Sequence, residues 1–324
     1  MQLQTNDFIS DLKKWQHRYM NWMQMQDYSK NTLELYDRVV KQFVKYSLQY
    51  QDEMSLKDIR STYFSEFVSF LEREAYESGK KQNRDGKYLS KSTKDAYMKA
   101  IKSYFTYISD NNDDLYTFDR YFRNAKIRDK SKPEEKMKHL TDSEVEGLLN
   151  QLKEDKANKD DYNSYRNSLL IKLMLHAGLR ISEALAIRLQ DFSTDEDENI
   201  YLIQIFGKGA KEQTGYILKQ HIQEEINYFI EVAKLDADEF IMRTKNNARL
   251  DRRSAFTIVN RIYSKANISK KGLHILRHTL AMHLTNMNVN PLIIKKMLRH
   301  ASISTTTIYA KASNSSISKA LKTT

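Results

Sequence analysis

Glycine and proline are scarce in this sequence, and that scarcity limits the folds open to it more than any other feature. Only 8 Gly and 2 Pro occur among 324 residues. Because proline interrupts helices and glycine weakens them, their rarity is typical of long helices joined by few tight turns. The length suits two domains of ordinary size. With 40% hydrophobic residues, the chain can bury a core in each.

The first 125 residues carry helical patterns throughout. Apolar side chains recur at intervals of three and four after Ser29, after the capping-box-like segment 55–58, and again from about Ser92. The third of these predicted helices follows a loop expected at residues 79–90, and lysines are interleaved with its apolar stripe. Those lysines indicate either a solvated helix face or contacts to phosphates.

The second domain is predicted to begin after a charged linker. Residues 126–138, KIRDKSKPEEKMK, lack apolar periodicity, and the capping box at 141–144 then opens a domain of residues 139–324. Alternating β-prone residues at 200–206 and 214–218 predict a small sheet with Lys208 in its turn. The predicted fold class is therefore mainly α with a small β-sheet: a helical domain, 1–125, followed by an α+β domain with a C-terminal tail.

The charge of the chain is strongly basic and unevenly spread. Lys and Arg number 53 against 42 Asp and Glu, and from Asp251 to the end 13 basic residues meet a single acid. A domain with one basic end is typical of a protein with a polyanionic partner. The absence of cysteine excludes disulfides and thiolate metal sites. No apolar run approaches the ~18 residues of a membrane span, so we expect a cytoplasmic protein without a membrane partner.

Four separated segments of the second domain hold the candidate catalytic residues. They are AGLRISE (177–183), GKGAK (207–211), HILRH (274–278) and LRH (298–300), the last followed by Tyr309. Each has an ordinary interpretation when taken alone. Arg180 and Glu183 have the spacing of a helix ion pair, Lys208 suits any hairpin turn, and Tyr309 is one of 20 tyrosines. Histidines 274, 278 and 283 lack the glutamate of a His-Glu-x-x-His zinc site, so no metal is predicted.

Taken together and in this order, the four segments resemble the motifs of the tyrosine recombinase (phage integrase) family. AGLRISEALAIRLQDF is similar to the family's first arginine box and GKGAK to its lysine hairpin. HILRHTLAMHL and LRHASISTTTIYA are similar to the second box and the terminal tyrosine segment. The resemblance implies a helical core-binding domain followed by the α+β catalytic domain of this family.

The resemblance also implies a mechanism. Tyr309 would be the nucleophile, leaving a 3′-phosphotyrosyl link and a free 5′-hydroxyl. Arg180 and Arg277 would bind the non-bridging phosphate oxygens, a task that suits guanidinium groups because they stay charged and bind phosphate through two parallel bonds. No cofactor is implied, because the covalent link conserves the energy of the phosphodiester.

The resemblance implies three further catalytic residues and one supporting residue. Lys208 would be the general acid that protonates the leaving 5′ oxygen. His274 would be a hydrogen-bonding acid or base, and His300 would donate to the phosphate or help to position Tyr309. Glu183 would orient a residue that touches the phosphate.

Contacts to the DNA duplex are predicted for a wider set of residues. These are Lys91, Lys94, Lys211, Arg252, Arg253, Lys271, Arg299 and Thr306. Arg299 is a departure from the family, which commonly has Gly at that position. It indicates either an additional phosphate contact or a constraint on the loop.

The family works as a homotetramer on two paired duplexes and passes through a Holliday junction, so we expect double-stranded DNA with an inverted-repeat target as the partner. The two-domain length resembles Xer-type recombinases that resolve chromosome dimers, which implies an FtsK-type DNA translocase as a further partner. The alternatives are an integrase of a mobile element, a type IB topoisomerase-like nicking and resealing enzyme, and a non-catalytic DNA-binding regulator. Residues after Tyr309 form either a frayed terminus or a short helix that docks on a neighbouring subunit.

Overall fold

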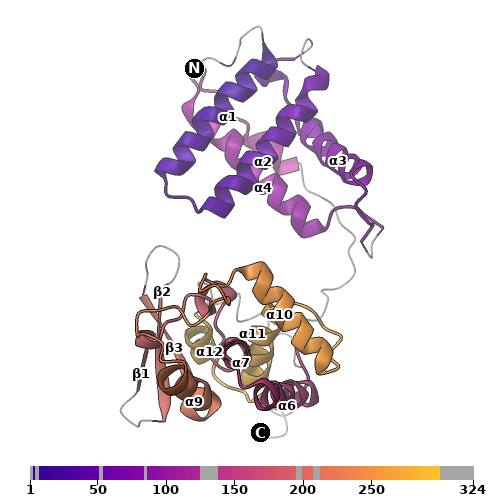
Figure 1. Cartoon of the computed structure of the whole chain (residues 1–324). Coiled ribbons are helices and arrows are strands. Elements are labelled where there is room, and N and C mark those ends of the chain that lie inside the picture. Colours follow the sequence, from indigo (N-terminus) through magenta and orange to yellow (C-terminus); the bar gives the residue numbers. More distant parts are fainter. Residues whose placement is uncertain are drawn as a thin grey trace, which may run out of the picture. The chain divides into compact units, whose positions relative to one another are not determined.

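The computed structural model describes residues 3, 7–50, 54–83, 86–124, 138–194, 199–206 and 212–299. The chain divides into two compact units, residues 1–133 and 134–324 (Figure 1). The predicted linker lies outside the described residues except for Lys138. The fold class predicted from the sequence, mainly α with one small sheet, is confirmed.

The first unit is helical over its described residues. Its α-helices are α1 (Phe8–Met25), α2 (Lys30–Ser47), α3 (Ser61–Glu77), α4 (Lys91–Asn111) and α5 (Asp119–Asn124). Serine side chains cap two of them: Ser29 accepts from the backbone N–H of Thr32, and Ser90 from that of Thr93. The Ser55 capping box caps the start of a one-turn 3₁₀ helix, Leu56–Asp58, so α3 begins five residues later than that box alone suggests.

Aromatic rings fill the core of the first unit. Phe43 of α2 lies 5.1 Å from Phe67 of α3 and 5.4 Å from Phe105 of α4, measured between ring centroids. Both pairs meet edge to face, the arrangement that aromatic quadrupoles favour. Helices α2, α3 and α4 are therefore held around one aromatic centre, and their polar faces remain at the surface.

The second unit packs its helices around α7 (Figure 1). The helices are α6 (Asp142–Lys159), α7 (Tyr162–His176), α8 (Ile181–Ala184), α9 (Lys219–Asn227), α10 (Arg252–Lys265), α11 (His274–Asn286) and α12 (Pro291–Leu298). The predicted capping box opens α6, where Thr141 accepts from the N–H of Glu144. Helix α7 is buried along most of its length, as expected of a central helix that is apolar on several faces.

A buried carboxylate ties three of these helices together. Glu225 of α9 is fully buried, and its Oε1 accepts from Lys156 of α6 at 2.8 Å. The same oxygen accepts from Lys172 and Ser168 of α7, each at 2.7 Å. Because charges are expensive to bury without partners, this cluster favours one arrangement of α6, α7 and α9.

The sheet has three antiparallel strands in the order β1 (Phe192–Thr194), β2 (Ile200–Phe206) and β3 (Glu212–Leu218). The two predicted strands are confirmed as β2 and β3, and β1 is an additional edge strand. The side chains of Tyr201, Ile203 and Ile205 point into the core, as alternation along a strand requires. Among the described helices, none is long and apolar enough to cross a bilayer.

Candidate active site

The turn between α7 and α8 is the backbone segment around which the site is arranged. Gly178 adopts φ +60°, and a Cβ on it would lie 2.6 Å from Cδ2 of Leu298, the last residue of α12. Only glycine combines that backbone conformation with so close a neighbour. The backbone of this turn therefore lies directly against the end of α12.

Arg180 extends from this turn and is held by two partners. Its Nη1 donates to Oε1 of Glu183 at 2.6 Å, and its Nη2 donates to the carbonyl oxygen of Arg299 at 3.0 Å. The ion pair allowed by the sequence spacing is thus formed. It does not bury Arg180, whose side chain remains 39% exposed. Arg180 is both anchored and accessible, which a phosphate-binding arginine requires.

Arg277, on the first turn of α11, is held by backbone oxygens. Nη1 donates to the carbonyl of Gly178 and Nη2 to that of Leu298. The residue is only 5% exposed. Arg277 therefore joins the α7–α8 turn, α11 and the end of α12 at one point, and it lies beside the anchors of Arg180.

His274 lies one turn before Arg277 and is exposed to solvent. Loss of hydration lowers the pKa of its ring, and the positive charges of Arg252, Arg277 and Arg180 lower it further. His274 is therefore neutral at pH 7 and can accept a proton. Burial similarly lowers the pKa of His278 on the same helix, with added effects of His274 and Arg277.

Glu183 is an ionised carboxylate inside the protein. Burial raises its pKa, but the hydrogen bond from the Arg180 backbone N–H and the charge of Arg299 outweigh burial and leave the pKa below its ordinary value. The backbone bond measures 2.8 Å. An ionised Glu183 holds both arginines, and its supporting role in catalysis remains a prediction.

The structure thus brings together Arg180, His274 and Arg277 from the predicted catalytic set, with Glu183, the predicted supporting residue. Other predicted site residues lie outside the described residues: Lys208, Lys211, His300, Thr306 and Tyr309. The sequence assigned no role to the carbonyl of Gly178 or to His278. An Ala-Gly pair after a long helical pattern is a signal for a turn, although it does not indicate that the glycine carbonyl serves as an acceptor.

Three of the predicted DNA contacts of the second unit lie at the start of α10 or just before α11, and the charge of one of them, Arg252, acts on His274. Arg252 and Arg253 are exposed in the first turn of α10, and Lys271 is exposed in the loop before α11. Cations at a helix N-terminus are opposed by the helix dipole. The carboxylate of Asp251, which caps this helix, offsets part of that cost for Arg253, and a bound phosphate would offset it further.

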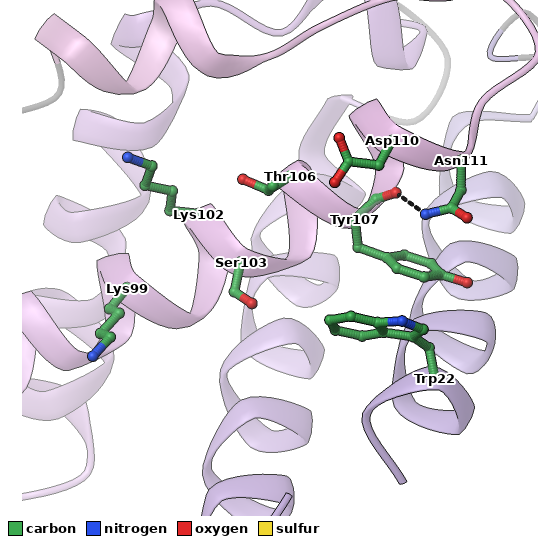
Figure 2. Close-up of a pocket in the computed structure, with 8 residues that line it drawn as sticks. All are labelled: Trp22, Lys99, Lys102, Ser103, Thr106, Tyr107, Asp110 and Asn111. Atoms are coloured by element: carbon green, nitrogen blue, oxygen red, sulfur yellow. Dashed lines mark hydrogen bonds between the residues drawn. The ribbon is translucent and has the colours of Figure 1, made fainter. Parts of the chain in front are cut away.

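Helix α4 carries the predicted contacts of the first unit. Lys91 is exposed, whereas Lys94 forms an ion pair with Glu72 of α3. Two further lysines of α4, Lys99 and Lys102, line a hollow of about 480 Å³ (Figure 2). Serine and threonine hydroxyls of the same helix share this hollow. Exposed lysines next to hydroxyls suit contacts to a phosphate backbone, whereas Lys94 already has a partner.

Arg299 has internal partners. Its residue is 8% exposed, and Nη2 donates to the carbonyl of Gly178 at 2.9 Å and to Oε2 of Glu183 at 3.2 Å. Of the two interpretations that the sequence left open, these contacts favour a constraint on the loop over an additional phosphate contact.

Family models match both units. The model described as phage integrase family matches residues 138–316, more than half of the chain, and that of the phage integrase SAM-like domain matches residues 11–108. A helical domain followed by this catalytic domain defines an enzyme that cleaves and rejoins DNA. The chain belongs to the phage integrase family, the tyrosine recombinases.

Similar proteins include several Xer recombinases. Tyrosine recombinase XerH of Helicobacter pylori is 29% identical over 79% of this chain and 68% of that protein. XerH of Campylobacter jejuni is 28% identical over 70% of this chain and 64% of that protein, so the match spans somewhat less than two thirds of that relative. XerA of Pyrococcus furiosus is 27% identical over 83% of this chain and 96% of that protein.

Solved structures share the fold. XerH bound to its palindromic difH substrate after cleavage has a TM-score of 0.80 at 22% identity, covering 99% of this chain and 98% of that one. The Tn1549 transposon integrase in complex with circular intermediate DNA has a TM-score of 0.66 at 16% identity, covering 95% and 98%.

Proposed function

We propose that this protein is a site-specific recombinase that cleaves DNA through Tyr309. The observation that supports this function most directly is the meeting of Arg180 and Arg277 at the α7–α8 turn, with the neutral His274 beside them. Two fixed cations next to a proton acceptor are what transfer of a phosphodiester to a hydroxyl requires.

The proposed step is an in-line phosphoryl transfer. The hydroxyl oxygen of Tyr309 bonds to the scissile phosphorus, and the bond from phosphorus to the 5′ oxygen breaks. Negative charge gathers on the non-bridging oxygens, where Arg180 and Arg277 stabilise it. The products are a 3′-phosphotyrosine and a free 5′-hydroxyl. Attack by a 5′-hydroxyl from the partner duplex reverses the bond changes and completes strand exchange.

Proton transfers accompany this step. His274, neutral at pH 7, takes up a proton as the tyrosine hydroxyl loses its own. Lys208 gives a proton to the leaving 5′ oxygen. His300 donates a hydrogen bond to the phosphate or positions Tyr309. These assignments of Lys208, His300 and Tyr309 rest on the sequence motifs.

The substrate proposed here is duplex DNA with inverted-repeat half-sites. The exposed arginines of α10 and the exposed lysines of α4 provide cations for phosphates on each unit. XerH, which shares the fold, is bound to a palindromic site in its crystal structure. We propose a homotetramer on two such duplexes, with a Holliday junction as the intermediate.

The biological role we propose is chromosome dimer resolution in the cytoplasm, with an FtsK-type translocase as partner. The Xer relatives support this role. Integration of a mobile element, topoisomerase-like resealing and non-catalytic DNA binding are the alternatives, and one experiment separates them.

That experiment captures covalent complexes on DNA from the host of the protein. Fragmented genomic DNA is incubated with the protein in a metal chelator and denatured, and the ends of protein-linked fragments are sequenced. Tyr309→Phe serves as the test variant and Tyr28→Phe, at an exposed tyrosine of the first unit, as its matched control. We expect linked fragments with the unmodified protein and with Tyr28→Phe, and none with Tyr309→Phe.

Each distribution of fragment ends has its own meaning. One inverted repeat at a single chromosomal site supports dimer resolution, and a repeat that flanks a mobile segment supports an integrase. Ends without a common sequence indicate a topoisomerase-like activity. If the unmodified protein forms no adduct even on a pre-nicked site that it binds, a non-catalytic binding protein is indicated.

A further inference from the structure

Arg299 occupies a backbone conformation that arginine rarely adopts. It ends α12 with φ 53° and ψ 46°, in the left-handed region. Side chains with a Cβ are disfavoured there, which is why helices commonly end in glycine at such a position. Arginine at this place therefore requires interactions that compensate for the backbone.

Those interactions connect Arg299 to the turn that carries Arg180. Its Nη2 donates to the Gly178 carbonyl and to Glu183, and its Nη1 donates to the carbonyl of Met297 at 2.9 Å. In return, the carbonyl of Arg299 accepts from Nη2 of Arg180. The residue thus holds Arg180 twice, directly through its own oxygen and indirectly through Glu183.

Arg277 is connected to the same residue through a shared oxygen. The carbonyl of Gly178 accepts from both Arg277 and Arg299. The other carbonyl that holds Arg277 belongs to Leu298, the neighbour of Arg299 in the chain. A shift of Arg299 would therefore displace acceptors of both phosphate-binding arginines.

The sheet leaves room for this guanidinium. A Cβ on Gly215 of β3 would lie 3.5 Å from Nη1 of Arg299 and 3.0 Å from Cδ1 of Ile205. The side chain of Arg299 is 3% exposed, so in this conformation it is not presented to a ligand at the surface. The guanidinium of Arg299 is therefore enclosed by protein groups.

We propose that Arg299 is a positioning residue for DNA cleavage: through Glu183, the Gly178 carbonyl and its own carbonyl, it fixes the places of Arg180 and Arg277. Since this role rests on the function proposed above, the test must separate loss of positioning from absence of recombinase activity. It must also separate positioning from a general loss of stability.

The test compares four proteins on one nicked DNA substrate that traps the covalent adduct. The variants are Arg299→Gly, which suits the left-handed backbone, Arg299→Lys, which keeps the charge, and Arg166→Gln. Arg166 is the matched control: it is 5% exposed, against 8% for Arg299, and it donates to a side chain, that of Asn167, and to a backbone carbonyl, that of Arg243. DNA affinity, melting temperature and single-turnover cleavage are measured for each across a range of pH.

We expect Arg299→Gly to bind DNA as the unmodified protein does and to form the adduct about 10- to 100-fold more slowly, because misplaced catalytic groups cost about that much. The acid limb of its rate profile should move to higher pH, since Glu183 loses a cation that keeps it ionised. Arg299→Lys should restore part of the rate. Arg166→Gln should melt earlier without a specific loss of cleavage rate.

Two results would overturn the positioning role. The first is cleavage by Arg299→Gly at the rate and with the pH profile of the unmodified protein. The second is an equal loss of rate in Arg166→Gln at an equal loss of melting temperature. Absence of an adduct from the unmodified protein would instead overturn the proposed function, and the positioning role with it.

Discussion

Arg299 donates to Glu183 across 3.2 Å, and both side chains are buried. A buried ion pair stabilises a structure only where its remaining hydrogen bonds are also satisfied. Glu183 meets that condition through the backbone and side chain of Arg180. Arg299 meets it at Nη1 and Nη2, whereas its buried Nε has no hydrogen-bond partner among the described residues. The pair thus connects the end of α12 to the turn that carries an arginine of the active site.

Replacing either arginine of the site should separate catalysis from binding. Arg180→Ala and Arg277→Ala should each slow formation of the covalent adduct about 10²- to 10³-fold, the usual cost of removing a group that stabilises developing charge. Specific binding, measured by fluorescence anisotropy, should largely persist. Arg180→Ala should lower the melting temperature, because the buried Glu183 loses a charged donor. Arg277→Ala should also lower it, because Arg277 is buried between two carbonyls. Loss of binding would mean that the arginines are structural.

Gly178 and Gly147 should respond oppositely to a methyl group. In Gly178→Ala, the new Cβ would meet Leu298 at 2.6 Å and Leu280 at 3.0 Å on a left-handed backbone. Unfolding free energy should fall by about 1–3 kcal/mol. Gly147 lies within α6, and a Cβ on it would lie 3.9 Å from the carbonyl oxygen of Ala266, an ordinary contact distance. Gly147→Ala should raise stability by about 0.5–1 kcal/mol. Thermal melts of both variants check the contrast, and equal effects would contradict it.

Glu225→Gln should destabilise the second unit strongly at neutral pH. The substitution removes the carboxylate charge that pairs with both Lys156 and Lys172. The free energy of unfolding should fall by about 3–5 kcal/mol. Glu224→Gln is the control: it changes an exposed neighbour that also pairs with Lys156, and should cost about 0–1 kcal/mol.

The same cluster predicts a dependence of stability on pH. Burial raises the pKa of Glu225, but Lys172, Lys156 and Ser168 outweigh burial and leave it below its ordinary value. Because the folded pKa lies below the unfolded one, the contribution is complete above about pH 4.3 and is lost as pH falls through the folded pKa. Melting curves between neutral and acid pH should show the penalty of Glu225→Gln shrinking in acid. A constant penalty would mean that Glu225 is not ionised.

Replacing Arg252 should raise the pKa of His274. Burial and then the charge of Arg252 are the leading causes of its lowered value. In Arg252→Gln, the His274 ring should titrate closer to about 6.5, the value of an unperturbed histidine. NMR titration of the ring signals, assigned with His274→Gln, measures this change. Arg253→Gln should leave the titration of His274 unchanged. A similar rise of the His274 pKa in Arg253→Gln would contradict a specific effect of Arg252.

DNA affinity should fall steeply with salt, and the two α10 arginines should each contribute to that slope. Removing one phosphate contact lowers the slope of log affinity against log salt by about 1. Arg253→Ala should show this loss on any duplex. Lys45→Ala is a control, because Lys45 pairs with Glu74 at 2.6 Å. An unchanged slope for Arg253→Ala would show that this end of α10 is not at the interface.

The sequence predicted the elements whose signals are local. Strands β2 and β3 and the start of α6 agree with the predicted segments because alternation and a capping box depend on residues close in the chain. Strand β1, three residues long, carried no such pattern. The predicted boundary residues of the domains and the tail remain predictions.

The site itself depends on contacts between distant segments. The sequence placed Arg180 and Arg277 in one site only through the resemblance of their segments to family motifs. No spacing in the sequence indicated that Gly178 would lie beside Leu298. The internal role of Arg299 depends on Glu183, 116 residues earlier, and on the space beside Gly215. Such relationships arise only when α12, the α7–α8 turn and β3 have packed together.

The arginines of the site are held largely by main-chain oxygens, those of Gly178, Met297, Leu298 and Arg299. A point mutation replaces a side chain but keeps the main-chain oxygen at that position. The hydrogen bonds that hold these arginines are therefore retained when the residues that provide the oxygens are substituted. Only a substitution that changes the backbone conformation would move these oxygens. Relatives of this chain could therefore vary widely around the site and still present their arginines alike, as long as the glycine at the turn persists.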